Sequence, residues 1–157
     1  LVDVGRTVAG LAAAGTAARG PHSASAAPPV EVFEEQMGYL PVVDGRGRRV
    51  YAPARVFETS TPQAVALAKH LKRAGATFYG AYWCPHCRNQ RRMFGKEALS
   101  YVHYVECDAQ GIGSKSDVCR RAMVDGYPTW VIGDKRVSGE RQLAELAQLS
   151  GFKGDFD

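Results

Sequence analysis

The sequence predicts a mixed α/β domain, and two features of its second half carry this prediction. Residues 76–83 and 101–107 have the pattern of strands and are separated by a helix-like segment, as in a strand, a crossover helix and a parallel strand. Short strand-like segments at 130–132 and 136–138 then flank a Gly-Asp turn, which predicts an antiparallel hairpin. We therefore expect a mixed central sheet flanked by helices.

The helices are predicted from caps and apolar spacing. Ser60-Thr61-Pro62 gives a helix start, and apolar residues at positions 64, 65, 67, 68 and 71 form one face of the helix that follows. Gly75 is expected to end it. Further helix-like segments cover 88–99, 114–124 and about 139–149. The expected order is helix, strand, helix, strand, helix, strand, strand, helix.

Length and composition bound the class of protein. The 157 residues have room for one domain of ordinary size, and 45% hydrophobic with 23% charged residues is typical of a globular fold. No apolar run reaches the roughly 18 residues that cross a bilayer as a helix, which argues against a polytopic membrane protein. The 20 basic and 16 acidic side chains are spread along the chain, so nucleic acid is not an expected partner.

The first 59 residues are expected to differ from the domain at 60–152. Within residues 1–27, an apolar stretch of small residues follows Arg6, and Ala24-Ser25-Ala26 has the form of a signal-peptidase site. This predicts an export or targeting leader, with a docking segment or a functionless Ala-rich tail as alternatives. Residues 28–59 are rich in Pro, Gly and charge and are expected to form a connector with a possible hairpin. Residues 1–59 are thus expected to form an extended N-terminal arm, and residues 153–157 a C-terminal tail.

The chemistry is predicted by the motif Cys84-Pro85-His86-Cys87, which stands between a predicted strand and a predicted helix. At the start of a helix, free N–H groups and the macrodipole favour a thiolate on Cys84, and Cys87 lies one turn further along, within bonding reach. We expect Cys84 to attack and Cys87 to resolve the mixed disulfide. Pro85 suits the first helical turn, and His86 adds positive charge or a donor beside the sulfur, which makes the disulfide more oxidising.

Other roles for the pair are weaker. A structural zinc site needs a second close pair of ligands, which the spacing of Cys107 and Cys119 does not supply, and a structural disulfide across two residues is uncommon. We therefore expect neither a metal nor a cofactor. Tyr127-Pro128-Thr129 precedes a strand, where a cis proline would lie against the cysteines, but a trans bond is the more frequent form.

Longer runs carry a resemblance. FYGAYWCPHC together with GYPTW resembles the thioredoxin superfamily. The full set, FYGAYWCPHCRNQRRMFGKEA, YVEC, a lone Cys119, GYPTW and SGERQLAELAQLSGF, resembles the thioredoxin-like domain attached to plant and cyanobacterial vitamin K epoxide reductase homologues, which are lumen thiol oxidoreductases. The resemblance covers about 60–152 and implies a thioredoxin-like fold. It also implies that Cys84 and Cys87 are the redox pair, that Pro128 is cis, and that Cys107 and Cys119 form a second pair.

The resemblance further implies a disulfide oxidase or isomerase of protein substrates in the thylakoid lumen of the chloroplast, with another oxidising exported compartment as the alternative. Trp83, Tyr127 and Thr129 are then expected to contact the substrate. The membrane domain of that family is not expected in this sequence, so a separate membrane oxidant or a membrane protein complex is the expected partner.

Two points stay open. The strand at 76–83 contains no Asp or Glu, and Phe78 stands where thioredoxins keep a carboxylate, so water, His86 or Glu58 is expected to accept the proton of Cys87.

A different class of function is a structural or assembly subunit of a photosynthetic membrane complex, with the thioredoxin fold as scaffold and residues 1–59 as docking arm.

Overall fold

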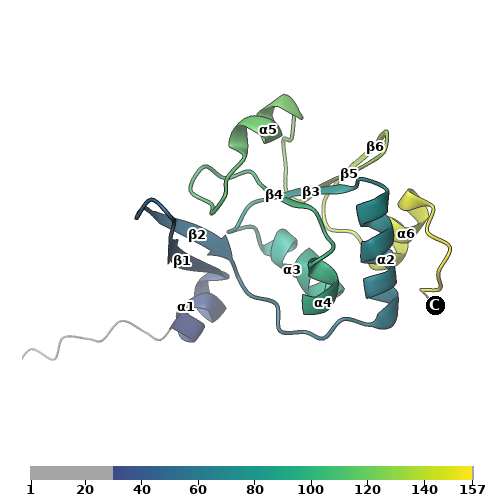
Figure 1. Cartoon of the computed structure of the whole chain (residues 1–157), viewed down its shortest axis with the longest axis horizontal. Coiled ribbons are helices and arrows are strands. Elements are labelled where there is room, and N and C mark those ends of the chain that lie inside the picture. The colour runs from purple at the N-terminus through teal and green to yellow at the C-terminus, as the bar shows by residue number, and fades with distance from the viewer. Residues whose placement is uncertain (1–29, 157) are drawn as a thin grey trace, which may run out of the picture.

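A four-stranded mixed sheet lies at the centre of the computed structural model, which describes residues 30–156 (Figure 1). Its strand order is β4-β3-β5-β6, with β3 at Thr77–Gly80, β4 at Tyr104–Glu106, β5 at Thr129–Ile132 and β6 at Lys135–Ser138. Strands β3 and β4 are parallel, whereas β5 is antiparallel to both β3 and β6. The predicted crossover, hairpin and mixed α/β class are confirmed.

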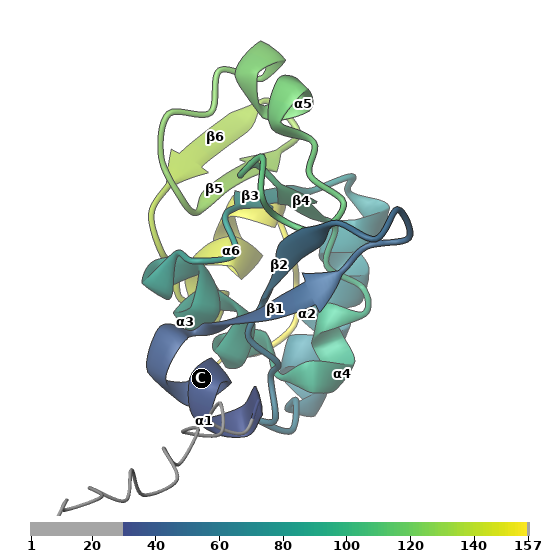
Figure 2. The same ribbon diagram turned by 90° about the vertical axis from the view of Figure 1, so that its left-hand side faces the viewer.

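Helices flank this sheet. They are α2 (Pro62–Arg73), α3 (Pro85–Phe94), α4 (Lys96–Leu99), α5 (Ser116–Arg121) and α6 (Leu143–Ser150). Helix α2 packs against α3, α4 and α6. Figures 1 and 2 show α5 apart from this group, on the other side of the sheet. Helices therefore lie on both sides of the sheet (Figures 1 and 2).

The core fills the space between the sheet and the main helix layer. Phe78 on β3 is fully buried and stacks on Trp130 of β5, with ring centroids 4.9 Å apart. Phe94 at the end of α3 lies 5.9 Å from the same indole ring. Leu67 and Leu146 complete this apolar centre with no exposed surface. Burial of such side chains is the main source of stability, so α3 is anchored at its C-terminal end.

The predicted helix at 88–99 is wrong in one respect, because it is two helices. Gly95 lies between α3 and α4 with φ of 79°, a conformation that favours glycine. A Cβ at this position would lie 2.7 Å from the backbone of Ser60. The break therefore follows from a close approach to a segment distant in sequence.

The region expected to be a connector contains helix α1 (Val30–Met37), which the sequence analysis missed, and a hairpin of β1 (Tyr39–Val43) and β2 (Arg49–Pro53). The hairpin is attached to the domain by backbone hydrogen bonds from Tyr51 N–H to Gln110 and from Ile112 N–H to Tyr51. Tyr51 also stacks on Tyr82 at 5.1 Å. This segment is therefore packed onto the loop that follows β4.

The leader predicted at 1–27 lies outside the described residues. No helix within residues 30–156 combines the length and the apolar character needed to span a bilayer.

Candidate functional site

Cys84 and Cys87 lie at the N-terminus of α3, directly after β3. Cys84 is the N-cap residue, and its Sγ accepts a hydrogen bond from the backbone N–H of Cys87 at 3.3 Å. Pro85 occupies the first turn, where its missing N–H leaves no bond unmade. Both cysteines are free thiols, with exposed fractions of 4% and 2%. The structure thus brings the two sulfurs together at the positive end of a helix.

The two thiols are inequivalent. The hydrogen bond from the Cys87 side chain, with help from the backbone N–H groups of Cys87 and His86 and the charge of His86, lowers the pKa of Cys84 to about 6. The pKa of Cys87 is raised, because its proton is held by Cys84 and its thiol is buried. Negative charge therefore resides on Cys84 and the proton on Cys87, which suits one to attack and the other to resolve.

His86 has a carboxylate partner on another element. Its Nδ1 lies 3.1 Å from the Oε2 of Glu140, which follows β6, and the Asn89 side chain donates to the same oxygen at 3.4 Å. Buried Gln90 ties this loop to α3, because it donates to the Arg141 carbonyl at 2.9 Å and accepts from the Arg141 N–H at 2.8 Å. The loop after β6 therefore positions an acid beside the motif.

The Tyr127–Pro128 peptide bond is cis and lies against Cys84. The Cys84 Sγ lies 3.7 Å from the Tyr127 carbonyl oxygen, to which it donates when it is protonated. Thr129 is only 1% exposed, and its hydroxyl donates to the Gly126 carbonyl and is hydrogen-bonded to the Ser138 hydroxyl, so it holds this loop to β6. Its contact with a substrate stays a prediction. Tyr127 is half-buried beside the sulfur.

Trp83 is 47% exposed directly before Cys84. Its indole N–H donates to Asp108 Oδ2 at 2.8 Å, and its ring packs edge-on to Tyr127 at 6.1 Å.

The structure joins Cys107 to Cys119 in a disulfide that links the end of β4 to α5. A groove of about 380 Å³ runs between these features, lined by Trp83, Cys107, Asp108, Ala109, Ser116, Cys119, Arg120, Val124 and Tyr127. Since those sulfurs are bonded to each other, they do not serve as zinc ligands with Cys84 and Cys87.

One buried carboxylate near the site was missed from the sequence. Glu106 at the end of β4 is 4% exposed, and burial raises its pKa. It accepts hydrogen bonds from the Tyr104 hydroxyl at 2.7 Å and from the Asp108 N–H at 2.9 Å. The parallel register pairs it with Gly80, four residues before Cys84. That register is the signal that would have revealed it.

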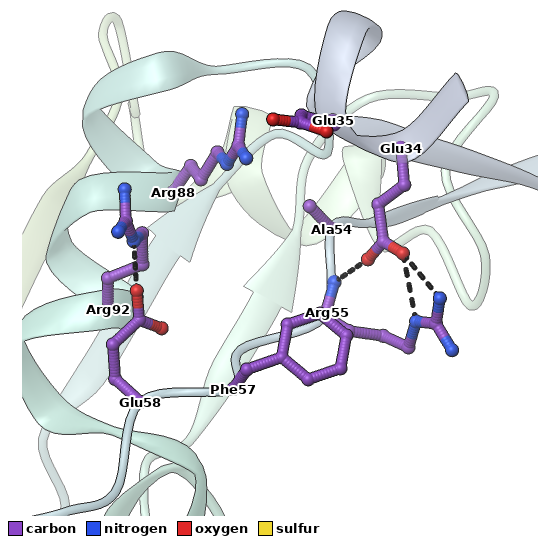
Figure 3. Close-up of a pocket in the computed structure, with 8 residues that line it drawn as sticks. All are labelled: Glu34, Glu35, Ala54, Arg55, Phe57, Glu58, Arg88 and Arg92. Carbon is purple, nitrogen blue, oxygen red and sulfur yellow. Dashed lines mark hydrogen bonds and ion pairs between the residues drawn. The ribbon is translucent and has the colours of Figure 1, made fainter. Parts of the chain in front are cut away.

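Glu58, one of the expected proton acceptors, is engaged elsewhere. Its carboxylate pairs with Arg92 on the side of α3 that faces α1 (Figure 3). There it lines a second pocket of about 440 Å³, together with Glu34, Glu35, Ala54, Arg55, Phe57, Arg88 and Arg92. Neither cysteine lines this pocket.

Comparison with known proteins supports thiol chemistry. No protein-family model matches the chain. An Arabidopsis thaliana protein named "Thiol-disulfide oxidoreductase LTO1" is 46% identical over 108 residues, a match that covers 67% of this chain and 29% of that protein. The chain thus matches less than a third of the length of this relative. It is a homologue of a protein named as a thiol–disulfide oxidoreductase.

Proposed function

We propose that this chain is a thioredoxin-like thiol–disulfide oxidoreductase of the oxidase or isomerase type, acting on protein substrates through Cys84 and Cys87. The observation that carries the proposal is the inequivalence of two adjacent free thiols, with the pKa of Cys84 lowered to about 6 and that of Cys87 raised. A structural pair of cysteines has no need of this difference. The named relative supports the same chemistry.

The reaction begins with a disulfide between Cys84 and Cys87. A substrate thiolate attacks the Cys84 sulfur, the bond to Cys87 breaks, and Cys87 leaves with the electron pair and takes up a proton. A second substrate thiolate then attacks the substrate sulfur of the mixed disulfide and releases Cys84 as a thiolate. The substrate loses two electrons and the protein gains them. Isomerisation begins with the reduced protein: the Cys84 thiolate attacks a substrate disulfide, and one substrate thiolate leaves. Another substrate thiolate then attacks the substrate sulfur of the mixed disulfide, and Cys84 leaves as a thiolate, so no electrons are gained or lost overall.

Several neighbours support these steps. The N-terminal N–H groups of α3 and the charge of His86 stabilise the Cys84 thiolate as a leaving group. The cis Tyr127–Pro128 segment places a carbonyl beside the reacting sulfur and is suited to align a substrate backbone there. Trp83 and Tyr127 present aromatic surface at the mouth of the adjoining groove, where a substrate segment would bind.

The direction of transfer follows from the pKa of Cys84. A thiol with a lowered pKa stabilises the reduced form at neutral pH, and this makes the corresponding disulfide a stronger oxidant. The proposal therefore favours oxidation of substrates over their reduction.

The setting proposed is an oxidising lumen, most specifically that of the thylakoid. The Cys107–Cys119 disulfide is typical of proteins from oxidising compartments, and the named relative is a plant protein. A separate membrane oxidant, or a membrane protein complex, is proposed to restore the Cys84–Cys87 disulfide.

The experiment is oxidation of a reduced, unfolded secretory protein by the oxidised chain. The wild-type chain is expected to transfer one disulfide per molecule, and Cys84→Ser to transfer none. With a substrate that carries disulfides, Cys87→Ser is expected to accumulate a mixed disulfide through Cys84, visible by non-reducing electrophoresis. Absence of both transfer and mixed disulfide would refute the proposal.

A further inference from the structure

Glu106 is a buried carboxylate at the end of β4. Within residues 30–156, the hydrogen-bond donors to its carboxylate are neutral. They are the Tyr104 hydroxyl and the backbone N–H groups of Asp108 and Tyr82. A carboxylate with 4% exposure costs free energy unless it is used or compensated. Its position near Cys87 suggests a role in the thiol chemistry.

Two glycines leave the room that this carboxylate and its partner occupy. A Cβ on Gly111 would lie 2.2 Å from the Glu106 Cγ, so the Glu106 side chain fits only against a glycine. A Cβ on Gly80 would lie 2.7 Å from the Tyr104 ring, 3.1 Å from the Cys87 Sγ and 3.3 Å from the Tyr104 hydroxyl. The Cys87 sulfur and the Tyr104 hydroxyl therefore border the same small space above Gly80.

The charged and titratable groups around this space come from several elements. Arg91 on α3 lies one turn after Cys87, and its charge acts on Cys87, Tyr104 and Glu106 while its guanidinium donates to the Ala54 carbonyl at 2.6 Å. Within residues 30–156, further groups that interact with Glu106 or Cys87 are Tyr82 before α3, Asp108 after β4, Tyr127 before β5, and Cys84. Arg91 thus supplies a positive charge beside the sulfur that must become a thiolate.

We propose that Tyr104 and Glu106 form a proton relay for Cys87, the resolving thiol; the proposal rests on the function proposed above. Cys87 gives its proton to the Tyr104 oxygen while the Tyr104 proton passes to Glu106. The Cys87 thiolate then attacks the Cys84 sulfur of a mixed disulfide, a Cys84–Cys87 bond forms, and the bound thiol leaves as a thiolate with the electron pair. In substrate oxidation the relay runs backwards and returns the proton to Cys87.

The electrostatics of the cluster agree with this geometry. Burial raises the pKa of Glu106 above that of an ordinary carboxyl group, and this makes it a stronger base. The hydrogen bond from Tyr104 requires Glu106 to accept, as a carboxylate does. Arg91 offsets the charge that moves between the sulfur and the carboxylate.

The test separates the two thiol steps by stopped-flow absorbance. Reduced protein is mixed with an aromatic disulfide that releases coloured thionitrobenzoate: Cys84 releases the first equivalent, and attack by Cys87 on the resulting mixed disulfide releases the second. Glu106→Gln and Tyr104→Phe are expected to slow the second release by about tenfold or more and to change the first less than twofold. Glu35→Gln and Tyr101→Phe, which alter the same residue types away from the relay, are expected to match the wild type.

The pH profile distinguishes a relay from a structural role. In the wild type the second release is expected to slow as the pH falls through the raised pKa of Glu106, and this limb is expected to vanish in Glu106→Gln. Second-step rates equal to wild type in both variants, or a slowed Glu106→Gln that keeps the limb, would overturn the relay. Failure of the wild type itself to release a second equivalent would instead overturn the proposed function. Tyr104→Phe, which removes one oxygen atom, tests the relay if Glu106→Gln does not fold.

Discussion

The Cys84 sulfur and the Cys87 backbone N–H are 3.3 Å apart and share a hydrogen bond across the first turn of α3. This contact does two things. It stabilises negative charge on one sulfur, and it fixes the backbone so that the second thiol lies on the same side of the helix.

The first prediction concerns the ionisation of Cys84. Its thiolate absorbance in the reduced protein is expected to titrate with a midpoint of about 6, against 9.0 for an ordinary thiol, and Cys84→Ser is expected to remove this transition. Because the folded pKa is the lower one, the thiolate stabilises the reduced fold fully above pH 9.0, and this stabilisation is lost as the pH falls through about 6. Urea unfolding of reduced wild type and Cys84→Ser across this range measures the difference, and a pH-independent difference would contradict the assignment.

The second prediction concerns His86. Replacing it by alanine removes a positive charge that favours the Cys84 thiolate, so the midpoint of Cys84 is expected to rise by about one pH unit. His103→Ala is the matched control, since this imidazole is exposed and bonds Thr77 rather than the motif. An unchanged midpoint in His86→Ala would show that the helix N-terminus and Cys87 account for the lowered pKa without it.

A third prediction concerns Trp83. Its exposed ring stands at the groove beside Cys84, so Trp83→Ala is expected to raise KM for a protein substrate by about tenfold, the effect of losing about 1.4 kcal/mol of contact energy. The midpoint of Cys84 is expected to stay unchanged, which separates substrate binding from chemistry. Phe57→Ala removes an aromatic ring that is 68% exposed but lies at the other pocket, and is expected to have no effect on KM. Equal effects of the two substitutions would argue against a substrate site at the groove.

The Cys107–Cys119 disulfide gives a fourth prediction. It closes a loop with a sequence separation of 12, for which the chain-entropy estimate is about 3 kcal/mol of stabilisation. The double variant Cys107→Ala, Cys119→Ala is expected to lose about this much free energy of unfolding in urea. The double variant Cys84→Ala, Cys87→Ala retains that disulfide and provides the control. A loss below about 1 kcal/mol would mean that the bond contributes little to the fold.

The elements that could be predicted from the sequence are those determined by neighbouring residues along the chain. The caps and turns around α2, β5 and β6 are local, so their order and the parallel pairing of β3 with β4 followed from a few residues. The placement of Cys84 at a helix N-terminus followed from Pro85 and the spacing of the motif in the same way.

The features that sequence reasoning missed depend on contacts between distant segments. Glu106 faces the cysteines because of the register between β3 and β4 and because Gly111 leaves it room, and neither is visible in its neighbours along the chain. The break at Gly95 follows from the approach of Ser60. The hydrogen bonds of the Thr129 hydroxyl to Gly126 and Ser138 also join residues that are separated along the chain.

The redox role of Cys84 and Cys87 is tested most directly by equilibrating the chain with glutathione redox buffers of known potential, followed by acid quenching, alkylation and mass spectrometry of the peptide that carries both cysteines. We expect a single reversible two-electron transition in which the two sulfurs bond to each other, at a potential less negative than the roughly −270 mV of thioredoxin. Separate glutathione adducts on the two cysteines without a bond between them would contradict it.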